Sequence, residues 1–350
     1  MKILHIIFSM LTGGSETMLV DIVNEQARLG HEVELLIINS QINEDIIKGM
    51  VPEVRVSRFN RRQGSMPLLL MARLNLFVAR RHPDVIHLHS HKLPGLLRIM
   101  RGRTVFTVHD INTPMQYAGG VSMAAISDAV KYYILEQRPG AHVRTVLNGI
   151  VIENIRLHEP RNNDSEFRIV QVGRLMASKK GQDILIDALT KLLARGYRAT
   201  VTFIGDGADL ESLKAQATRL GIADKVIFEG ARDRAYIYKR LADFDIMCHP
   251  SRYEGFGLTV AEGMAAGLPL VVPEFGGPWE VAGSGRYCRS FASGDASACA
   301  DALAAVMDSY AEAAALAEKG RKYVADNFSV RRMVADYIAY YKTLSGVKNN

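Results

Sequence analysis

Short apolar runs alternate along the whole chain with longer segments in which apolar residues recur at helical spacing. Residues 3–10 form an apolar run typical of a strand, and residues 16–29 repeat apolar side chains every three or four positions before Gly30. Strands that are apolar throughout, with helices between them, predict a parallel sheet covered on both faces. Further strands are predicted at residues 32–38, 84–89, 104–109 and 124–127, and a further helix at 128–136.

The pattern restarts after a polar segment, residues 151–165, that contains Pro160. We place a boundary in this segment and predict two doubly wound α/β domains, residues 1–155 and 156–350. The tail is helical, and we keep open that its last helix, about residues 330–345, crosses back to the first domain. In doubly wound sheets, ligands bind beyond the carboxyl ends of the strands. The second domain is expected to contain strands at 167–172, 200–204, 225–229, 246–249 and 270–272, and helices at 182–195 and 208–220.

Composition narrows the class of protein. Hydrophobic residues make up 48% of the chain and charged residues 23%, which excludes a disordered, collagen-like or coiled-coil chain. The net charge of +6 is too small by itself to indicate nucleic-acid binding. Cys248, Cys288 and Cys299 are too far apart for a disulfide framework or a zinc site, which favours a reducing compartment. No apolar run reaches the ~18–20 residues of a membrane span, and we interpret the N-terminus as a buried strand rather than a signal peptide.

Glycine-rich turns follow three predicted strands, at residues 12–16, 205–207 and 254–259. Glycine lets a backbone approach a ligand closely, and the free N–H groups of a following helix suit a diphosphate. Arg174, Lys179 and Lys180 follow the strand at 167–172, and such cations bind phosphate oxygens. The alternative interpretation is that the turns only connect elements and that the basic loop is solvated.

Two carboxylates accompany the third turn. Glu254 directly precedes its glycines, and Glu262 lies eight residues later, inside a predicted helix. A carboxylate can accept two hydroxyl hydrogen bonds, which suits a ribose or a hexose. Alternatively, Glu262 only stabilises the helix N-terminus.

Together these motifs resemble those of the group 1 glycosyltransferases, glycosyltransferase family 4. Residues 251–258 with Glu262 and residues 267–269 resemble the E-x7-E signature of that family. The resemblance covers nearly the whole chain, and its combination of motifs is specific although no single motif is. Further matches are residues 172–175, 180–181, 203–207 and 276–278 in the second half, and residues 13–16, 87–90, 107–110 and 148–149 in the first.

The resemblance implies a GT-B fold, in which two Rossmann-like domains face a central cleft, and a retaining hexosyltransferase. Such an enzyme moves a sugar from a nucleotide-diphosphate sugar to a glycan or lipid-linked acceptor, here in polysaccharide or lipopolysaccharide assembly. The nucleotide sugar is then a co-substrate, with UDP favoured over GDP, and no metal or other cofactor is needed. A nucleotide-sugar epimerase of similar fold and a non-catalytic nucleotide-sugar binder remain the alternatives.

The matching motifs also imply roles for individual residues. Glu262 would hold the donor ribose, and Glu254 the hydroxyls of the transferred sugar. His109 would reach the donor sugar near the scissile bond, and Asp110 is a less favoured candidate for a covalent nucleophile. The remaining donor-binding residues implied by the resemblance are Gly14, Arg174, Lys179, Lys180, Gly205, Gly257, Leu258 and Thr259.

The sequence departs from the family pattern in two places. The loop between Arg174 and Gly181 is one residue longer than the commonest family form, so Lys179 rather than Lys180 could be the phosphate ligand. Gly263 stands where the family more often has Ala. It either loosens the helix by ~1 kcal/mol or admits closer approach of a ligand.

Two other signals have competing interpretations. His87, His89 and His91 alternate, so on a strand all three would point to one face, as metal ligands do. The resemblance instead explains His89 as a cleft residue at the end of a strand.

Residues 53–103 contain eleven Lys/Arg and two acids, and within them residues 67–82 are Leu-rich and flanked by arginines. Residues 67–82 resemble a basic amphipathic helix that lies on an anionic membrane. The alternative interpretation is an ordinary domain helix with a solvated basic side. No aromatic platform interleaves its charges, so nucleic acid is not expected. We therefore expect a cytoplasmic enzyme that can lie on the inner face of the membrane.

Overall fold

The computed structural model describes residues 1–11, 13–62, 67–160 and 166–345, and its chain divides into two compact units. The first unit comprises residues 1–149 together with the C-terminal segment from Val330. The second unit is Ile150–Ser329. The division after Gly149 lies six residues before the boundary that we expected after residue 155.

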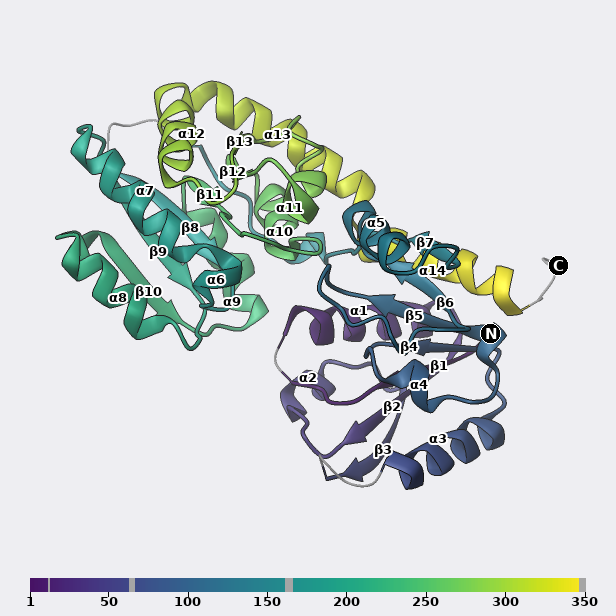
Figure 1. Cartoon of the computed structure of the whole chain (residues 1–350). Helices are drawn as coiled ribbons and strands as arrows, with labels where there is room; N and C mark the ends of the chain where they lie inside the picture. The colour runs from purple at the N-terminus through teal and green to yellow at the C-terminus, as the bar shows by residue number, and fades with distance from the viewer. Residues whose placement is uncertain (12, 63–66, 161–165, 346–350) are drawn as a thin grey trace. The chain divides into compact units, whose positions relative to one another are not determined.

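The first unit is built on a seven-stranded sheet whose described strand pairs are all parallel (Figure 1). In spatial order the strands are β3 (Arg55–Arg61), β2 (Glu32–Asn39), β1 (Lys2–Ile7), β4 (Val85–Leu88), β5 (Thr104–Val108), β6 (Ser122–Ala125) and β7 (Val143–Thr145). Its helices are α1 (Gly14–Arg28), α2 (Glu44–Lys48), α3 (Pro67–Arg81), α4 (Leu93–Leu96), α5 (Asp128–Gln137) and α14 (Val330–Ser345).

The second unit repeats this design with a six-stranded parallel sheet. In spatial order the strands are β10 (Val226–Gly230), β9 (Ala199–Ile204), β8 (Phe167–Val172), β11 (Ile246–Cys248), β12 (Leu270–Pro273) and β13 (Arg289–Phe291). Its helices are α6 (Ala177–Lys180), α7 (Gln182–Ala194), α8 (Leu210–Arg219), α9 (Arg234–Arg240), α10 (Leu258–Ala266), α11 (Gly276–Val281), α12 (Ala296–Asp308) and α13 (Tyr310–Asn327). Both sheets begin with the strand order 3-2-1-4 of a Rossmann-like fold, so the predicted fold class is confirmed.

Three strands were not predicted from the sequence, and all three lie at sheet edges. The strand β3 is basic and only one of its seven residues, Phe59, is buried, so its pattern lacks the apolar run of a central strand. The strands β7 and β13 each have three residues, which is too short for a periodic signal.

The C-terminal helix α14 packs on the first unit through three buried tyrosines, Tyr337, Tyr340 and Tyr341. The Tyr340 hydroxyl donates to the carbonyl of Met123 at 3.1 Å, and the Tyr341 hydroxyl lies 2.6 Å from Nδ1 of His87. Burial raises the pKa of Tyr337 to about 12, so its hydroxyl stays protonated. The last helix therefore completes the core of the first unit.

Across the described ranges, no helix is both long and apolar enough to span a bilayer.

Candidate functional site

An ion pair lies among the loops that follow the strands of the second unit. It joins Nζ of Lys180, at the end of α6, to Oε2 of Glu254, in the loop after β11. The two side chains are 19% and 17% exposed, so the pair is largely removed from water. The strands β8 and β11 are neighbours in the sheet, which brings the two loops together.

His249 is the third member of this cluster. Its Nε2 is 3.8 Å from Oε2 of Glu254, too far for a direct hydrogen bond, and this buried nitrogen has no hydrogen-bond partner within the described part of the chain. Its Nδ1 lies 3.4 Å from Oγ1 of Thr259, in the first turn of α10. Burial lowers the pKa of His249, although the Glu254 carboxylate opposes this shift, so the ring is neutral at pH 7.

Glu254 is ionised despite its burial. Burial by itself raises the pKa of a carboxyl, but the neighbouring His249 and Lys180 outweigh this and hold the pKa of Glu254 well below its usual range. The cluster therefore presents a fixed carboxylate and a fixed ammonium side by side. A carboxylate of this kind can accept hydrogen bonds from hydroxyl groups.

Hydrogen bonds from neighbouring loops fix the position of Lys180. The side chain of Gln171 donates to the carbonyl of Lys180 at 2.7 Å. The guanidinium of Arg252 forms two hydrogen bonds with Asp183, at 2.8 and 2.6 Å, and a third with the carbonyl of Ala177. These contacts join the loop after β8 to the loop after β11, so Lys180 and Glu254 are positioned before any ligand binds.

The other cations of this loop have different surroundings. Arg174 is exposed, and its guanidinium has no partner among the residues that the structure describes. Nζ of Lys179 lies 5.3 Å from the centre of the Tyr253 ring. Gly205, at the end of β9, donates its N–H to the carbonyl of Gly230 at 2.9 Å.

The helix α10 begins beside the cluster with its first N–H groups uncapped. Its N-cap, Gly257, has φ +94°, and no side chain caps the helix before Leu258 and Thr259. Such a helix start attracts an anion, because its N–H groups and its dipole point outward. Glu262 lies on the same helix and is 9% exposed.

Gly263 has a packing role in α10. A Cβ at this position would lie 2.4 Å from Sδ of Met247, a residue of β11. Glycine therefore lets α10 lie close against the sheet, a packing role that neither of the two sequence interpretations included.

The candidate histidine of the first unit is neutral. His109 directly follows β5, and its buried Nε2 has no hydrogen-bond partner in the described ranges. Burial lowers the pKa of His109 to about 4, although the adjacent Asp110 opposes the shift. Gly14 is the first residue of α1, and the carboxylate of Glu16 lies over the preceding Gly13, where a Cβ would be 2.5 Å from Oε2.

The alternating histidines do not share one strand face as we expected. The strand β4 ends at Leu88, so His91 lies in the following turn, and the third buried imidazole beside His87 and His89 comes from His5 on β1. Donor atoms of these three rings lie within 4.8 Å of one another, close enough to hold a metal ion.

Protein groups already use these ring nitrogens. His5 contacts Nε2 of His89 at 3.0 Å and Oε1 of Gln26 at 2.7 Å. His87 contacts Oγ1 of Thr107 at 2.5 Å and the hydroxyl of Tyr341 at 2.6 Å. A hydrogen-bonded network thus accounts for His5 and His87 without a metal.

Sequence reasoning missed His249 and His5. His249 is the last residue of the strand predicted at 246–249, and its place at the carboxyl end of that strand was the available signal. His5 lies inside the first strand, and only the pairing of β1 with β4, which puts His5 opposite His87, reveals it.

In both units, charged and polar residues lie at the carboxyl ends of the strands of a Rossmann-like sheet, which is where such sheets bind ligands. Two family models match the chain: Glycosyltransferase Family 4 over residues 12–154, and Glycosyl transferases group 1 over residues 154–323. The chain therefore belongs to the group 1 glycosyltransferases, as the motif resemblance predicted.

Relatives with assigned names are glycosyltransferases of several kinds. N-acetyl-alpha-D-glucosaminyl L-malate synthase of Bacillus anthracis is 24% identical over 96% of both chains. The lipopolysaccharide core biosynthesis mannosyltransferase LpsB of Rhizobium meliloti is 31% identical over 47% of this chain and 49% of its own.

Solved structures confirm the GT-B fold. Anabaena HepE in complex with UDP and glucose has a TM-score of 0.82 at 23% identity, covering 99% of this chain and all of its own. The lipopolysaccharide outer core galactosyltransferase WaaB, in its apo form, has a TM-score of 0.77 at 18% identity, covering 98% of this chain and all of its own.

Proposed function

We propose that this glycosyltransferase is a retaining hexosyltransferase that takes its sugar from a nucleotide-diphosphate sugar. The observation that carries the proposal is the Lys180–Glu254 ion pair beside the uncapped start of α10. An activated sugar needs cationic and N–H groups for its diphosphate and hydrogen-bond acceptors for its hydroxyls. The second unit supplies both within one group of loops.

In this proposal the diphosphate binds Arg174, Lys180 and the N–H groups of Leu258 and Thr259. Two observations support the assignment of Arg174: its side chain is exposed, and its guanidinium has no partner in the described part of the chain. Lys180 is favoured over Lys179 because its ammonium already belongs to the cluster with Glu254. Positive charge at these positions stabilises the leaving diphosphate as the glycosidic bond breaks. The turn at Gly205 is the remaining part of the proposed donor site in the second unit.

The two glutamates bind the donor's hydroxyl groups. Glu254 accepts hydrogen bonds from the transferred sugar, and its low pKa keeps it an acceptor across the physiological range. Glu262 accepts from the ribose.

The first unit contributes His109 and Gly14. Neutral His109 offers its unpartnered Nε2 to the donor sugar near the scissile bond. Gly14 allows the backbone to approach the donor.

The reaction is proposed to proceed with retention at the anomeric carbon. The acceptor hydroxyl attacks from the face that the diphosphate leaves, and its proton passes to the departing phosphate oxygen. Asp110 is the less favoured alternative, as a nucleophile that forms a covalent sugar intermediate. No metal ion or other cofactor is needed in this scheme.

The donor and acceptor classes are supported by relatives. HepE structures contain UDP, glucose or UDP-glucose, which favours a UDP-sugar over a GDP-sugar. The names of LpsB and WaaB refer to lipopolysaccharide core assembly, which favours a glycan or lipid-linked acceptor.

A surface on α3 favours a membrane-bound acceptor. Leu68, Leu69 and Leu76 are 68%, 71% and 51% exposed, and the exposed Arg73 and Arg80 lie on the same helix. Leucines flanked by arginines suit an anionic bilayer surface, where the apolar side chains enter the interface and the guanidinium groups meet lipid phosphates.

A screen of nucleotide sugars for thermal stabilisation tests the donor proposal, because a ligand that binds only the folded chain raises its Tm. The best hit is then incubated with and without candidate glycan acceptors, and the products are identified by NMR. We expect an α-linked product from an α-linked donor, together with released nucleotide diphosphate. An epimerase would convert the donor with no acceptor, and a non-catalytic binder would never release the nucleotide; either result contradicts the proposal.

A further inference from the structure

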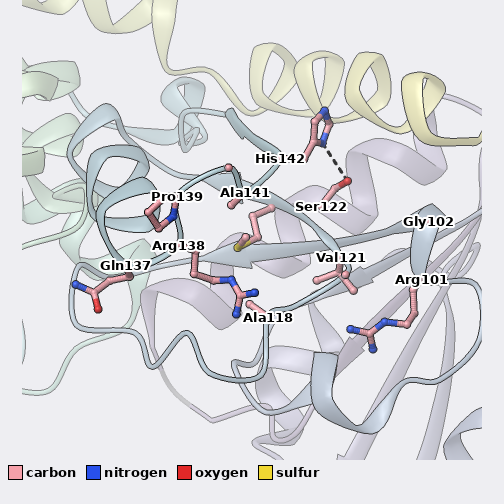
Figure 2. A pocket seen from close by; sticks show the side chains of 13 residues that line it. Arg101, Gly102, Ala118, Val121, Ser122, Gln137, Arg138, Pro139, Ala141 and His142 are labelled. Carbon is pink, nitrogen blue, oxygen red and sulfur yellow. Dashed lines mark hydrogen bonds between the residues drawn. The ribbon is translucent and has the colours of Figure 1, made fainter.

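The first unit contains a cavity of about 600 Å³ that no step of the proposed reaction uses (Figure 2). It lies where β5, β6 and β7 begin: Arg101 and Gly102 precede β5, Ser122 begins β6, and Ala141 and His142 precede β7. His109 instead follows β5. Because a strand rises about 3.3 Å per residue, the five residues of β5 separate the cavity from His109 by roughly 16 Å.

The cavity carries positive charge without a matching negative charge. Its lining contains Arg101 and Arg138 and no aspartate or glutamate. Arg101 donates to the carbonyls of Pro94 and Leu97, at 2.8 and 2.5 Å, and to the carbonyl of Gly119.

Arg138 is held in the same way, through a hydrogen bond to the carbonyl of Met115 at 3.1 Å. Neither arginine forms an ion pair with a carboxylate of the described chain. Carbonyl groups satisfy N–H donors but do not neutralise a guanidinium, so two positive charges remain at the cavity.

Several polar groups of the lining remain available to a ligand. A guanidinium has five N–H donors, and Arg138 uses one of them in its bond to Met115. Nδ1 of His142 lies 3.1 Å from the hydroxyl of Ser122, as Figure 2 shows, which leaves Nε2 for another partner. Gln137 adds an exposed amide.

We propose that this cavity binds a phosphate monoester carried by a small polyol. Arginine matches phosphate with two parallel hydrogen bonds, and the two uncompensated charges match its dianion. Ser122, Gln137 and His142 can bind hydroxyl groups, and the volume is within the range of small-molecule sites. The site is separate from the proposed donor site, because its residues lie around the starts of β5, β6 and β7, whereas His109 follows the end of β5.

The test avoids the two arginines, because both also hold the segment that follows Asp110. Gln137→Glu instead places a negative charge in the cavity with almost no change of shape, and Ala141→Glu does so from a second position. Gln41→Glu, at an exposed position outside the cavity, changes the net charge equally and is the control.

Calorimetric titrations with inorganic phosphate and with glucose 6-phosphate measure binding, with glucose as the uncharged comparison. They are run with and without UDP, so that phosphate binding at the proposed donor site is recognised by its competition with UDP. We expect saturable binding of glucose 6-phosphate that UDP does not displace. Gln137→Glu and Ala141→Glu should each weaken it about tenfold or more, and Gln41→Glu by less than about twofold.

A second arm identifies the source of the phosphate group. Vesicles of phosphatidylcholine with and without phosphatidic acid, a lipid phosphate monoester, are sedimented with the same variants. Binding that needs phosphatidic acid and is lost in Gln137→Glu assigns the site to a lipid head group, whereas binding of glucose 6-phosphate alone assigns it to a soluble ligand. The proposal is overturned if neither probe binds saturably, or if Gln137→Glu and Gln41→Glu weaken binding equally.

Discussion

The two units share a strand order but differ in the electrostatics of their candidate residues. The second unit presents an ionised pair, Lys180 and Glu254, at the carboxyl side of its sheet. The first unit has a neutral imidazole there, His109, and another inside β1, His5, since burial lowers the pKa of each to about 4. One fold thus supports charged groups where a diphosphate is expected and neutral hydrogen-bonding groups where a sugar is expected.

Burial leaves Glu254 charged in the second unit but leaves the buried histidines of the first unit neutral, because the groups next to them differ. Glu254 keeps its charge because a cation lies against it. The histidines of the first unit have mainly one another, Gln26 and tyrosine hydroxyls as neighbours, so desolvation prevails and they stay neutral.

Removing the charge of Glu254 is expected to have the largest effect. Glu254→Gln leaves Lys180 without its buried partner and removes the acceptor of the sugar hydroxyls, so kcat should fall about a thousandfold, equivalent to ~4 kcal/mol. Steady-state release of nucleotide diphosphate measures this. Glu318→Gln, which breaks an exposed ion pair with Arg321, is the matched control and should leave kcat within about twofold. If Glu254→Gln behaves like the control, the assigned role is wrong.

Acidification should unfold the first unit before the second. The pKa of His5 is near 4 in the folded chain and about 6.5 when exposed, so its contribution to stability is complete above pH 6.5 and disappears as the pH falls to 4. The loss is about 3 kcal/mol for His5 alone.

The only tryptophan, Trp279, lies in α11 of the second unit and reports on that unit. Far-UV circular dichroism should therefore change before Trp279 fluorescence as the pH is lowered. His5→Gln should reduce the pH dependence of unfolding, whereas His82→Gln, at an exposed position, should not. If both signals change at the same pH, the two units do not differ in their stability to acid, and the prediction is wrong.

Substitutions of Lys180 and Lys179 should differ in their effect on kcat/KM for the donor. Lys180→Gln removes a charge from the cluster and should lower kcat/KM about thirtyfold, or ~2 kcal/mol. Lys179→Gln should lower it by less than about threefold, because that ammonium lies over the Tyr253 ring. Initial rates over a range of donor concentrations give both values, and the reverse order would assign the phosphate to Lys179.

The smallest expected effect is on the stability that the hydrogen-bonded network around His5, His87 and His89 gives to the first unit. Tyr341→Phe removes a hydroxyl that lies 2.6 Å from Nδ1 of buried His87, and should lower the free energy of unfolding by about 1 kcal/mol. Tyr132→Phe, at a side chain that is 73% exposed, should have no measurable effect. Denaturant titrations of both variants compare the two; equal stabilities would mean that the network adds nothing to the fold.

Much of this fold follows from pattern alone, and the exceptions have physical reasons. The strand β8 buries four of its six residues and lies within its sheet, and its predicted bounds match the structure. The edge strand β3 is polar and was missed, because burial rather than intrinsic preference creates the apolar pattern.

The candidate site shows the same limit. Motifs indicated Lys180 and Glu254 separately, but their pairing depends on β8 and β11 being neighbours, which is a property of topology. The network of His5, His87 and His89 depends likewise on the pairing of β1 with β4. The sequence can identify the residues that carry charge, whereas only the packed structure shows which of them remain charged.

A crystal structure of the chain with bound UDP tests the central claim most directly. The account predicts the β-phosphate within hydrogen-bond distance of Arg174, Lys180 and the first N–H groups of α10, with Glu262 on the ribose. A diphosphate bound away from Lys180 and α10, or a ribose with no contact to Glu262, would contradict it.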